Sequence, residues 1–334
     1  MENEEEKTAE TVEESDVGID THRKVVIIGC GFVGSTIAYT LMIKGIFSKM
    51  VLIDADKDRA EGEAMDIAHG LLFSHPMEII AGGYDDINDA DMIIITAGAN
   101  QKPGETRLDL VKKNTAIFSS IIPEIKKRNY QGIILVVANP VDVLTKVAQK
   151  LSGLPENRVF GSGTVLDTAR LRYLLGQHLS IDSRSIHAFI IGEHGDSEIP
   201  VWSSANVAGV PIHQFCEMRG FFNHDEAMKQ IGESVKNSAY EIIKRKKATY
   251  YGIGMAVTRI CSAVMRDEHS ILPISTALHD DFGIDGVTMA MPAIICAKGV
   301  ERIVPISLSY EENKKLTSSA EILKQTLAEV GFKD

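Results

Sequence analysis

The chain has 334 residues and a mass of 36.5 kDa, enough for one large domain or two ordinary domains with substantial cores. Its hydrophobic content of 44%, charged content of 24% and mean hydropathy of +0.00 are typical of a globular protein, and no apolar run reaches the roughly 18 to 20 residues of a membrane-spanning helix. These numbers exclude a small disulfide-stapled scaffold and an integral membrane protein.

The net charge of −11 is concentrated at the N-terminus. The first 20 residues contain nine acidic residues against one lysine and have no aromatic residue. Such a block cannot bury enough apolar surface to fold, so we expect residues 1–21 to form an acidic, disordered tail. The tail resembles neither a secretory leader nor a transit peptide, which predicts a cytoplasmic protein, and the charge of the remainder gives no sign of nucleic-acid binding.

The four cysteines lie far apart in the sequence, at Cys30, Cys216, Cys261 and Cys296. No pair has metal-ligand or redox spacing, which indicates a reducing compartment and predicts no metal site.

Short β-branched apolar runs alternate with helical stretches between residues 24 and 163. The runs are 25–28, 51–53, 78–81, 92–96, 133–138 and 158–160. This rhythm predicts six parallel strands with helices on both faces, because right-handed crossovers cover both sides of such a sheet. We therefore expect an α/β fold with a doubly wound sheet over residues 22–163, whose ligands bind at the carboxyl ends of the strands.

The pattern changes after residue 163. A helix is predicted at 165–177, followed by a β-branched run at 185–191, long helical stretches between 225 and 265, and a polar C-terminal helix from Tyr310. We expect residues 164–334 to form a second, mixed α/β domain that carries the substrate site, with the chemistry in the cleft between the domains.

Residues 29–34, with the sequence GCGFVG, follow the first strand and precede a helix expected to begin near Ser35. Gly29 permits a tight turn, Gly31 lets a pyrophosphate approach the backbone, and Gly34 lets the helix pack closely, while the helix N-terminus supplies partial positive charge. In this context the motif predicts a Rossmann dinucleotide site rather than a structural glycine turn.

Asp54 ends the second strand, twenty residues after Gly34. Its carboxylate can accept hydrogen bonds from both ribose hydroxyls, whereas it would repel a 2′-phosphate, and no arginine follows immediately. The predicted cofactor is NAD rather than NADP.

His194 lies between two glycines at the end of the run 185–191, and Asp167 and Arg170 share one face of the helix before it. The carboxylate could orient an imidazole while the guanidinium grips a substrate carboxylate, although a local ion pair would leave the same pattern. The loop at residues 97–107 is rich in glycine and polar residues and suits a mobile lid, whose Arg107 could polarise a carbonyl. Asn139, after the fifth strand, is expected near the nicotinamide.

These segments resemble the NAD-dependent L-lactate and malate dehydrogenase family. The motifs that carry the resemblance are GCGFVG, LID at 52–54, AGANQKPGETR, VANPVD, LDTARLR and IGEHGDSE, in the family's order and spacing over residues 22 to 334. The resemblance implies that His194 donates and accepts the proton, Asp167 orients it, Arg170 clamps the substrate carboxylate and Arg107 is the lid arginine. It also implies that Asn139 and Thr249 face the substrate. The full set of expected cofactor-binding residues is Gly29, Gly31, Phe32, Val33, Gly34, Asp54, Ala97, Gly98 and Asn139.

Substrate choice in this family depends largely on the lid position occupied here by Gln101. Malate dehydrogenases carry an arginine there, which pairs with the second carboxylate of oxaloacetate; a neutral glutamine leaves that carboxylate unpaired. The resemblance thus implies pyruvate and lactate as substrates, with malate or a branched 2-hydroxy acid as the alternative. In the implied mechanism NADH binds first, pyruvate follows, the lid closes, and His194 gives its proton to the carbonyl oxygen as hydride arrives.

Regulation and assembly are implied by the same resemblance. Arg172 points away from the substrate by helical periodicity, and with His187 it matches positions that bind fructose 1,6-bisphosphate between subunits of activated bacterial relatives. Non-activated relatives can carry the same pair, so activation stays open. The family is usually tetrameric and sometimes dimeric, which predicts a homo-oligomer. Lys247 stands where many relatives have glycine, at the end of a basic run that begins at Lys244.

Two other classes of function remain as alternatives. NAD-dependent glycosidases share a related dinucleotide fold but need a metal, and turnover undiminished by a chelator would exclude them. A non-catalytic NAD sensor would not need His194, Asp167, Arg170 and Arg107 together, and an NADH assay with pyruvate separates the two.

Overall fold

The computed structural model describes residues 23–99 and 104–332. The predicted acidic tail at residues 1–21 lies outside the described residues. Among the described helices, none combines the length and the apolar character needed to cross a membrane.

The first half of the chain alternates strands and helices, as the sequence predicts. Its elements are β1 (Lys24–Ile28), α1 (Phe32–Lys44), β2 (Lys49–Ile53), α2 (Lys57–His69), η1 (Leu71–Phe73), β3 (Glu78–Ala81), η2 (Tyr84–Ile87), β4 (Met92–Ile95), α3 (Arg107–Lys127), β5 (Ile133–Val136), α4 (Val141–Ser152), η3 (Glu156–Arg158) and β6 (Val159–Gly161). All six predicted strands are present. The helix expected near Ser35 begins three residues earlier, at Phe32, because Gly31 has extended backbone angles and occupies the N-cap position.

The second half mixes helices with antiparallel strands. Its elements are α5 (Val165–Leu179), η4 (Ser183–Ser185), β7 (Ile186–Ile191), β8 (Ile199–Val207), β9 (Val210–Pro211), α6 (Ile212–Met218), α7 (His224–Lys246), α8 (Tyr251–Met265), β10 (Ser270–Asp281), β11 (Ile284–Cys296), β12 (Gly299–Ile303) and α9 (Tyr310–Glu329). The strands β7, β8 and β9 form a small sheet of their own.

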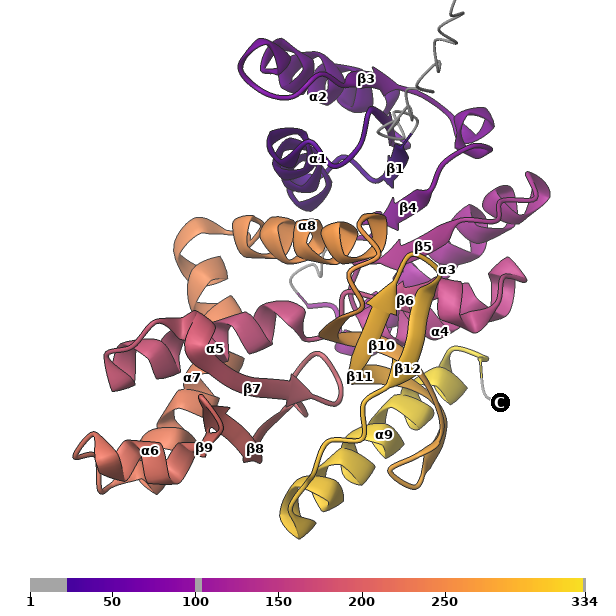
Figure 1. Ribbon diagram of the computed structural model, residues 1–334. Helices are drawn as coiled ribbons and strands as arrows, with labels where there is room; N and C mark the ends of the chain where they lie inside the picture. Colours follow the sequence, from indigo (N-terminus) through magenta and orange to yellow (C-terminus); the bar gives the residue numbers. More distant parts are fainter. Residues whose placement is uncertain (1–22, 100–103, 333–334) are drawn as a thin grey trace, which may run out of the picture.

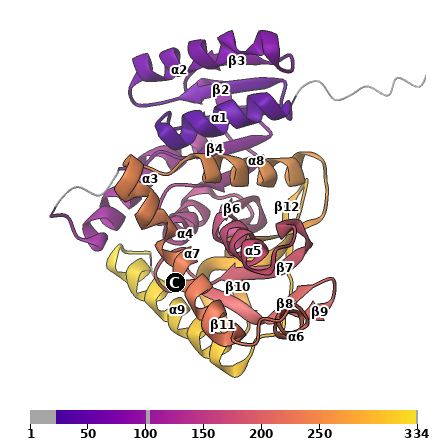
Figure 2. The same ribbon diagram turned by 90° about the vertical axis from the view of Figure 1, so that its left-hand side faces the viewer.

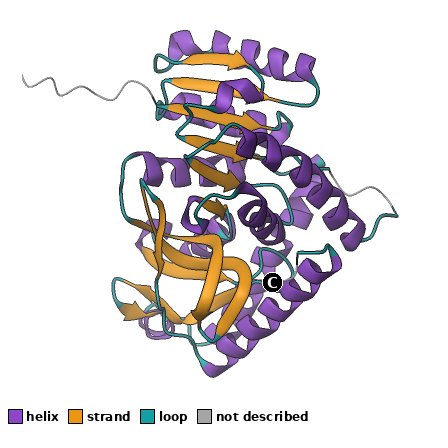
Figure 3. Cartoon of the chain, turned by 90° about the vertical axis from the view of Figure 1, so that its right-hand side faces the viewer, coloured by secondary structure: helices purple, strands orange, loops and turns teal. Residues whose placement is uncertain are grey.

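The main sheet has nine strands in the order β12-β11-β10-β6-β5-β4-β1-β2-β3. The six strands β1 to β6 are parallel and have the order of a doubly wound dinucleotide-binding sheet. Ser275 of β10 pairs with Gly161 of β6, and this antiparallel contact joins the curved strands β10–β12 to the parallel sheet. Figure 3 shows the stacked parallel strands in orange with purple helices on both sides, and the curved strands below them.

Alternate side chains of each central strand belong to separate cores. Val25 and Ile27 of β1 pack with α1, α2 and α8, whereas Val26 and Ile28 pack with α3 and α4. A strand covered on both faces has no solvent side, which explains why these strands are continuous apolar runs in the sequence.

Packing crosses the predicted domain boundary at residue 163, which lies in the link between β6 and α5. Helix α8, from the second half, lies against α1 in both views (Figures 1 and 2), and the hydroxyl of Thr258 donates a 2.8 Å hydrogen bond to that of Thr40. Gly254 permits the close approach, because a Cβ there would come within 2.7 Å of the Thr36 methyl carbon. The two halves are therefore joined by a shared sheet and by this helix contact.

Candidate active site

The glycine-rich turn after β1 has the geometry that its motif predicts. Gly29 has a φ of +104°, which is in the left-handed region that glycine tolerates best. A Cβ at Gly34 would overlap the carbonyl oxygen of Gly29, so this glycine lets α1 pack against the turn. A Cβ at Gly31 would meet nothing within 4 Å. The Gly31 backbone therefore faces open space, where a pyrophosphate could approach it.

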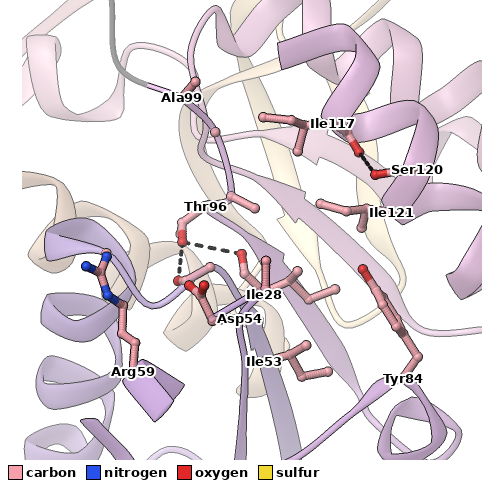
Figure 4. A pocket seen from close by; sticks show the side chains of 15 residues that line it. Ile28, Ile53, Asp54, Arg59, Tyr84, Thr96, Ala99, Ile117, Ser120 and Ile121 are labelled. Atoms are coloured by element: carbon pink, nitrogen blue, oxygen red, sulfur yellow. Dashed lines mark hydrogen bonds between the residues drawn. The ribbon is translucent and has the colours of Figure 1, made fainter. Parts of the chain in front are cut away.

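A cavity of about 570 Å³ opens at the carboxyl ends of β1, β2 and β4. Five of the predicted cofactor-binding residues line it, namely Gly29, Gly31, Asp54, Ala97 and Gly98. Figure 4 shows Asp54 and Thr96 at this edge, where the Thr96 hydroxyl donates a 2.7 Å hydrogen bond to the Gly29 carbonyl and supports the turn. The volume and the open backbone at Gly31 fit a dinucleotide.

Asp54 is held in place by backbone donors. Its Oδ2 accepts a 2.6 Å hydrogen bond from the Cys30 N–H, and its Oδ1 accepts a 2.9 Å bond from the Asp56 N–H. Arg59, from the first turn of α2, also lines the cavity (Figure 4). No arginine directly follows Asp54 in the sequence, but the first turn of α2 brings Arg59, five residues later, to the same cavity.

The remaining predicted cofactor residues have other surroundings. Phe32 and Val33 belong to the first turn of α1 and do not line the cavity. The Phe32 ring stacks on Tyr250, with ring centroids 5.4 Å apart, and so holds the segment between α7 and α8 against the start of α1. Asn139 lines a second cavity, described below.

The buried side chain of Asn114 connects the two cavities. It accepts a 2.7 Å hydrogen bond from the Ala99 N–H, and its Nδ2 donates to the carbonyl oxygen of Asn139 at 2.7 Å. The loop after β4 is thereby tied to the loop after β5, where the Asn139–Pro140 peptide bond is cis. Nothing in the sequence pattern around α3 distinguishes Asn114 from an ordinary helix residue.

His194 and Asp167 meet as predicted, 27 residues apart in the sequence. Asp167 Oδ2 lies 2.6 Å from His194 Nδ1. The contact exists because the start of α5 is fastened to the end of β7: the Thr164 hydroxyl donates to the Ile190 carbonyl at 2.5 Å, and the Ile190 N–H donates to Thr168 Oγ1 at 2.9 Å. Asp167 is buried, whereas the His194 side chain is 27% exposed and can meet a ligand.

The electrostatics of the pair favour a charged imidazole. Desolvation lowers the pKa of His194, but the charge and hydrogen bond of Asp167, with the charges of Asp142 and Glu198, outweigh it and raise the pKa from 6.5 to about 9. Burial raises the pKa of Asp167, but His194 and Arg170 outweigh burial and hold it below its ordinary value. At neutral pH this arrangement keeps a proton on His194.

Arg170 forms an ion pair with Asp167, which was the alternative to a substrate-binding role in the sequence-based prediction. Its Nη1 donates a 2.7 Å hydrogen bond to Asp167 Oδ1, while the other oxygen of Asp167 serves His194. The guanidinium also lines the second cavity and has further N–H donors, which bind no other group in the described part of the chain. One side chain can therefore both neutralise Asp167 and bind a carboxylate.

Arg107 is the first residue of α3, whose capping box pairs Thr106 with Asp109. It forms an ion pair with the buried carboxylate of Glu193, and its Nη1 lies 3.4 Å from Asp196 Oδ2. The predicted lid arginine thus lies beside the loop that carries His194. Gln101 lies outside the described residues.

The second cavity has a volume of about 420 Å³ and lies between the two halves of the chain. The predicted residues that line it are Arg107, Asn139, Asp167, Arg170 and His194. Residues 107 and 139 precede the boundary at 163 and the other three follow it, so the site lies in the cleft where the sequence placed it.

Two buried carboxyl groups lie next to His194 and were not among the site residues predicted from the sequence. Asp142 Oδ2 accepts a 2.8 Å hydrogen bond from the His194 N–H, and burial raises the pKa of Asp142 to about 6. Glu198 lines the second cavity with no hydrogen-bond partner for its buried Oε1 in the described part of the chain, and burial with the charge of Asp167 raises its pKa to about 8. Both lie within motifs that the sequence analysis quoted, but only the tertiary contacts show their neighbours.

Thr249 does not line either cavity. It lies half-buried between α7 and α8, next to Tyr250. The ammonium of Lys246 lies over the Tyr250 ring, 3.5 Å from the ring centroid. Lys247 ends α7 in a left-handed conformation with a φ of +71°, a position that suits glycine.

Arg172 and His187 do not line the second cavity. Arg172 Nε donates a 2.9 Å hydrogen bond to the Ala188 carbonyl, and its guanidinium lies over the Phe189 ring at 5.2 Å. His187 is exposed on β7. Arg172 therefore binds the residue that follows His187 in β7, and neither side chain lines the predicted substrate site.

Comparison with known proteins covers nearly all of the described chain. Residues 23–161 match the family model for the lactate/malate dehydrogenase NAD binding domain, and residues 164–332 match that for the lactate/malate dehydrogenase alpha/beta C-terminal domain. L-lactate dehydrogenase of Acetivibrio thermocellus is 51% identical over 305 residues, which is 91% of this chain and 96% of the relative. That of Priestia megaterium is 52% identical over 304 residues, 91% of this chain and 95% of the relative.

Solved structures agree with these matches. The minor L-lactate dehydrogenase of Enterococcus mundtii in its ligands-bound form superposes with a TM-score of 0.91 and 43% identity, covering 94% of this chain and 100% of that one. A lactate dehydrogenase enzyme from a Medee basin deep-sea metagenome library gives a TM-score of 0.90 and 48% identity, covering 93% of this chain and 99% of that one. Because two family models match consecutive parts of the chain and relatives about 50% identical cover nine-tenths of it, the chain belongs to the lactate/malate dehydrogenase family.

Proposed function

We propose that this protein is an NAD-dependent L-lactate dehydrogenase, which interconverts pyruvate and NADH with (S)-lactate and NAD⁺. The observation that carries the proposal is the cluster of His194, Asp167 and Arg170 in a cavity next to the dinucleotide cavity. The relatives named L-lactate dehydrogenase support the choice of substrate.

NAD would be held by the Gly29–Gly34 turn and by Asp54. Bound NADH supplies the hydride that reduces the carbonyl carbon. The turn offers backbone N–H groups and the N-terminus of α1 to the pyrophosphate, and Asp54 offers its carboxylate to the ribose hydroxyls.

The protein's own residues would bind the substrate and move the proton. Arg170 binds the carboxylate of pyruvate and so places the carbonyl oxygen near the imidazole of His194. His194, kept protonated by Asp167, donates its proton to that oxygen as the oxygen gains electron density. Arg107 stabilises the negative charge that develops on the same oxygen. Lactate oxidation uses the same groups in reverse, with neutral His194 as the base.

A substrate panel tests the proposal. Pyruvate, oxaloacetate and branched 2-oxo acids are each assayed with NADH and with NADPH, and pyruvate with NADH should give the largest kcat/KM. His194→Gln should lower turnover about 10²- to 10⁴-fold with little change in NADH affinity, whereas the exposed control His213→Gln should leave both unchanged. Full turnover in His194→Gln would refute the assignment.

The choice between lactate and malate rests on Gln101. Oxaloacetate has a second carboxylate, and burying it unpaired beside a neutral glutamine costs several kcal/mol. Pyruvate has a methyl group at that position and avoids this cost. Gln101→Arg should therefore raise kcat/KM for oxaloacetate relative to pyruvate. An unchanged ratio would mean that another residue reads the substrate side chain.

The assembly that fits this family is a homo-oligomer, usually a tetramer. A group of exposed apolar side chains on α1, α2 and η1 supports it, since Leu72 and Phe73 are 86% and 87% exposed and Tyr39, Ile43 and Met65 lie on the same elements. Phe73→Asp should reduce the molar mass measured by light scattering. A wild-type chain that is monomeric at enzyme-assay concentrations would contradict this part.

Fructose 1,6-bisphosphate is the proposed activator, bound near Arg172 and His187. The structural support is that Arg172 binds the carbonyl of Ala188, the residue after the exposed His187, outside the substrate cavity. Steady-state rates with and without the sugar phosphate test this, and no response at millimolar effector would rule it out. A cytoplasmic location and a role in glycolysis and fermentation fit an enzyme that re-oxidises NADH with pyruvate.

A further inference from the structure

Three potential metal ligands meet where β10 begins, beside the turn that connects β11 and β12. The ring nitrogen of His269, the thiol of Cys296 and a carboxylate oxygen of Glu301 all lie within 4.8 Å of one another. His269 directly precedes β10, Cys296 ends β11, and Glu301 lies in β12. The sequence predicted no metal site because Cys296 stands 27 residues from His269; pairing of β10 with β11 and of β11 with β12 brings the three together.

The cluster is remote from the substrate cavity. Nδ2 of Asn157 donates a 3.0 Å hydrogen bond to the carbonyl of Lys298, in the turn between β11 and β12. Asn157 lies in η3, two residues before β6 begins, so this turn lies at the amino end of that parallel strand, whereas both cavities lie at the carboxyl ends. A ligand here would not contact His194 or the dinucleotide site.

The thiol of Cys296 is buried without a partner. Its residue is 5% exposed, it forms no disulfide, and it has no hydrogen bond in the described part of the chain. By contrast, the buried Cys30 and Cys261 each contact an acceptor, the Ile53 carbonyl and the Met92 sulfur respectively. The Cys296 thiol is therefore free to bind a ligand. A cation would reach it from the side of the exposed His269 and Glu301.

His269 and Glu301 form the open side of the cluster. Their side chains are 55% and 41% exposed, and His269 Nδ1 lies 2.9 Å from Glu301 Oε2. Asp267 lies on the other side of the ring, 3.6 Å from Nε2, and its Oδ1 accepts a hydrogen bond from the Ala297 N–H at 2.8 Å. His269 and Asp267 both have positive φ, +49° and +50°, so the turn that presents the imidazole is strained.

We propose that His269, Cys296 and Glu301 bind one divalent cation of the zinc class. A thiolate, an imidazole and a carboxylate are the donors that Zn²⁺ combines in proteins, whereas Mg²⁺ and Ca²⁺ prefer oxygen alone. Three protein ligands leave a fourth tetrahedral position for water. On binding, Cys296 releases its thiol proton to solvent and His269 exchanges its contact with Glu301 for the metal, so affinity should rise with pH.

Such a cation would link the start of β10 to the two strands of the β11–β12 hairpin next to their turn. It would stabilise the antiparallel extension of the sheet without entering catalysis. The expected effect is a higher unfolding temperature at unchanged turnover, because a ligand that binds only the folded chain stabilises it.

Cobalt provides the test, since Co²⁺ occupies zinc sites and its bond to a thiolate gives an intense near-ultraviolet charge-transfer band. The full-length protein, freed of metal with a chelator, is titrated with Co²⁺. We expect one Co²⁺ per chain with this band, and loss of the band when Zn²⁺ is added. The band also separates this cluster from Asp167, His194 and Glu198, which could hold a cation but contain no sulfur.

Matched variants decide the ligands. Cys296→Ser should abolish the band, and the exposed Glu301→Gln should weaken binding at least about tenfold, while Cys216→Ser, another buried cysteine, should retain both band and affinity. Zn²⁺ should raise the unfolding temperature of the wild type and of Cys216→Ser but not of Cys296→Ser. A band that survives in Cys296→Ser, or Zn²⁺ affinity that is only millimolar and unaffected by Glu301→Gln, would overturn the proposal. Glu301→Gln keeps the test decisive if Cys296→Ser does not fold.

Discussion

The backbone N–H of His194 donates a 2.8 Å hydrogen bond to Oδ2 of Asp142, a buried carboxylate on α4. The other oxygen of Asp142 accepts a 2.5 Å bond from the hydroxyl of Ser275 on β10. Asp142, from the first half of the chain, therefore holds the main chain of the proposed catalytic histidine and a strand of the second half together. Asp167 holds the imidazole ring of the same histidine.

Asp142→Ala should destabilise the protein and lower turnover. It leaves two buried donors, the His194 N–H and the Ser275 hydroxyl, without an acceptor, at a cost of about 1–3 kcal/mol each. Urea unfolding measures the stability, and kcat/KM for pyruvate measures how far the variant displaces His194 from its proposed catalytic position. Wild-type values for both would show that His194 is positioned without this contact.

Asp142→Asn should remove a pH dependence of stability. Because burial raises the pKa of Asp142 from 3.8 to about 6, the folded protein binds this proton more tightly than the unfolded chain does. The contribution of Asp142 to stability is therefore present below pH 3.8 and is lost as pH rises to about 6, by up to roughly 3 kcal/mol. Unfolding at several pH values checks this: the wild type should lose stability relative to Asp142→Asn over that interval, and parallel curves would contradict it.

Pyruvate reduction should fail above about pH 9, and lactate oxidation should gain over the same range. In the proposed mechanism His194 is protonated for the first reaction and neutral for the second, and its pKa is raised to about 9. The raised pKa also means that its contribution to stability is complete below pH 6.5 and is lost as pH rises through 9. Rate profiles in both directions test the assignment.

Glu198→Gln should shift both profiles toward lower pH. Glu198 ionises near pH 8, so above that its charge helps to keep His194 protonated, and a glutamine removes that charge. Glu233→Gln, in α7 on the exposed surface, is the matched control and should leave the profiles in place. Identical profiles in all three proteins would show that Glu198 has no influence on the imidazole.

Asp54→Ala should relax the preference for NADH over NADPH. The wild-type carboxylate repels a 2′-phosphate, whereas Arg59 on the same wall of the cavity would attract one once the carboxylate is gone. The ratio of kcat/KM values for the two cofactors is the measurement. The double variant Asp54→Ala with Arg59→Ala should lose the gain with NADPH, and retention of that gain would exclude Arg59 as its source.

Lys247→Gly should stabilise the protein by up to about 1 kcal/mol, since a side chain in the left-handed conformation at a helix end is strained and glycine is not. Lys229→Gly is the matched control, because Lys229 is exposed inside α7 and should cost about 1 kcal/mol there. Chemical unfolding distinguishes the two. Equal losses would show that the turn after α7 tolerates lysine without strain.

The sequence by itself determined the parallel sheet, the glycine turn and several of the side chains that line the second cavity. Strands such as β1 are apolar at every position because both faces are covered, and Gly29 and Gly34 leave a signal because only glycine fits their backbone. His194, between Gly192 and Gly195, was likewise visible, because a turn after a strand requires glycine at particular positions close by in the sequence.

Only the tertiary structure decided which groups surround these residues. Asp142 and Glu198 lie within the motifs VANPVD and IGEHGDSE and Asn114 lies in a helix, but the neighbours of all three come from the tertiary structure, with hydrogen bonds to segments 15 to 133 residues away for Asn114 and Asp142. The pairing of β10 with β6 and the convergence of His269, Cys296 and Glu301 have no local signature either. The physical reason is that burial and electrostatic coupling depend on distance in space, whereas propensity and periodicity record only the neighbours along the chain.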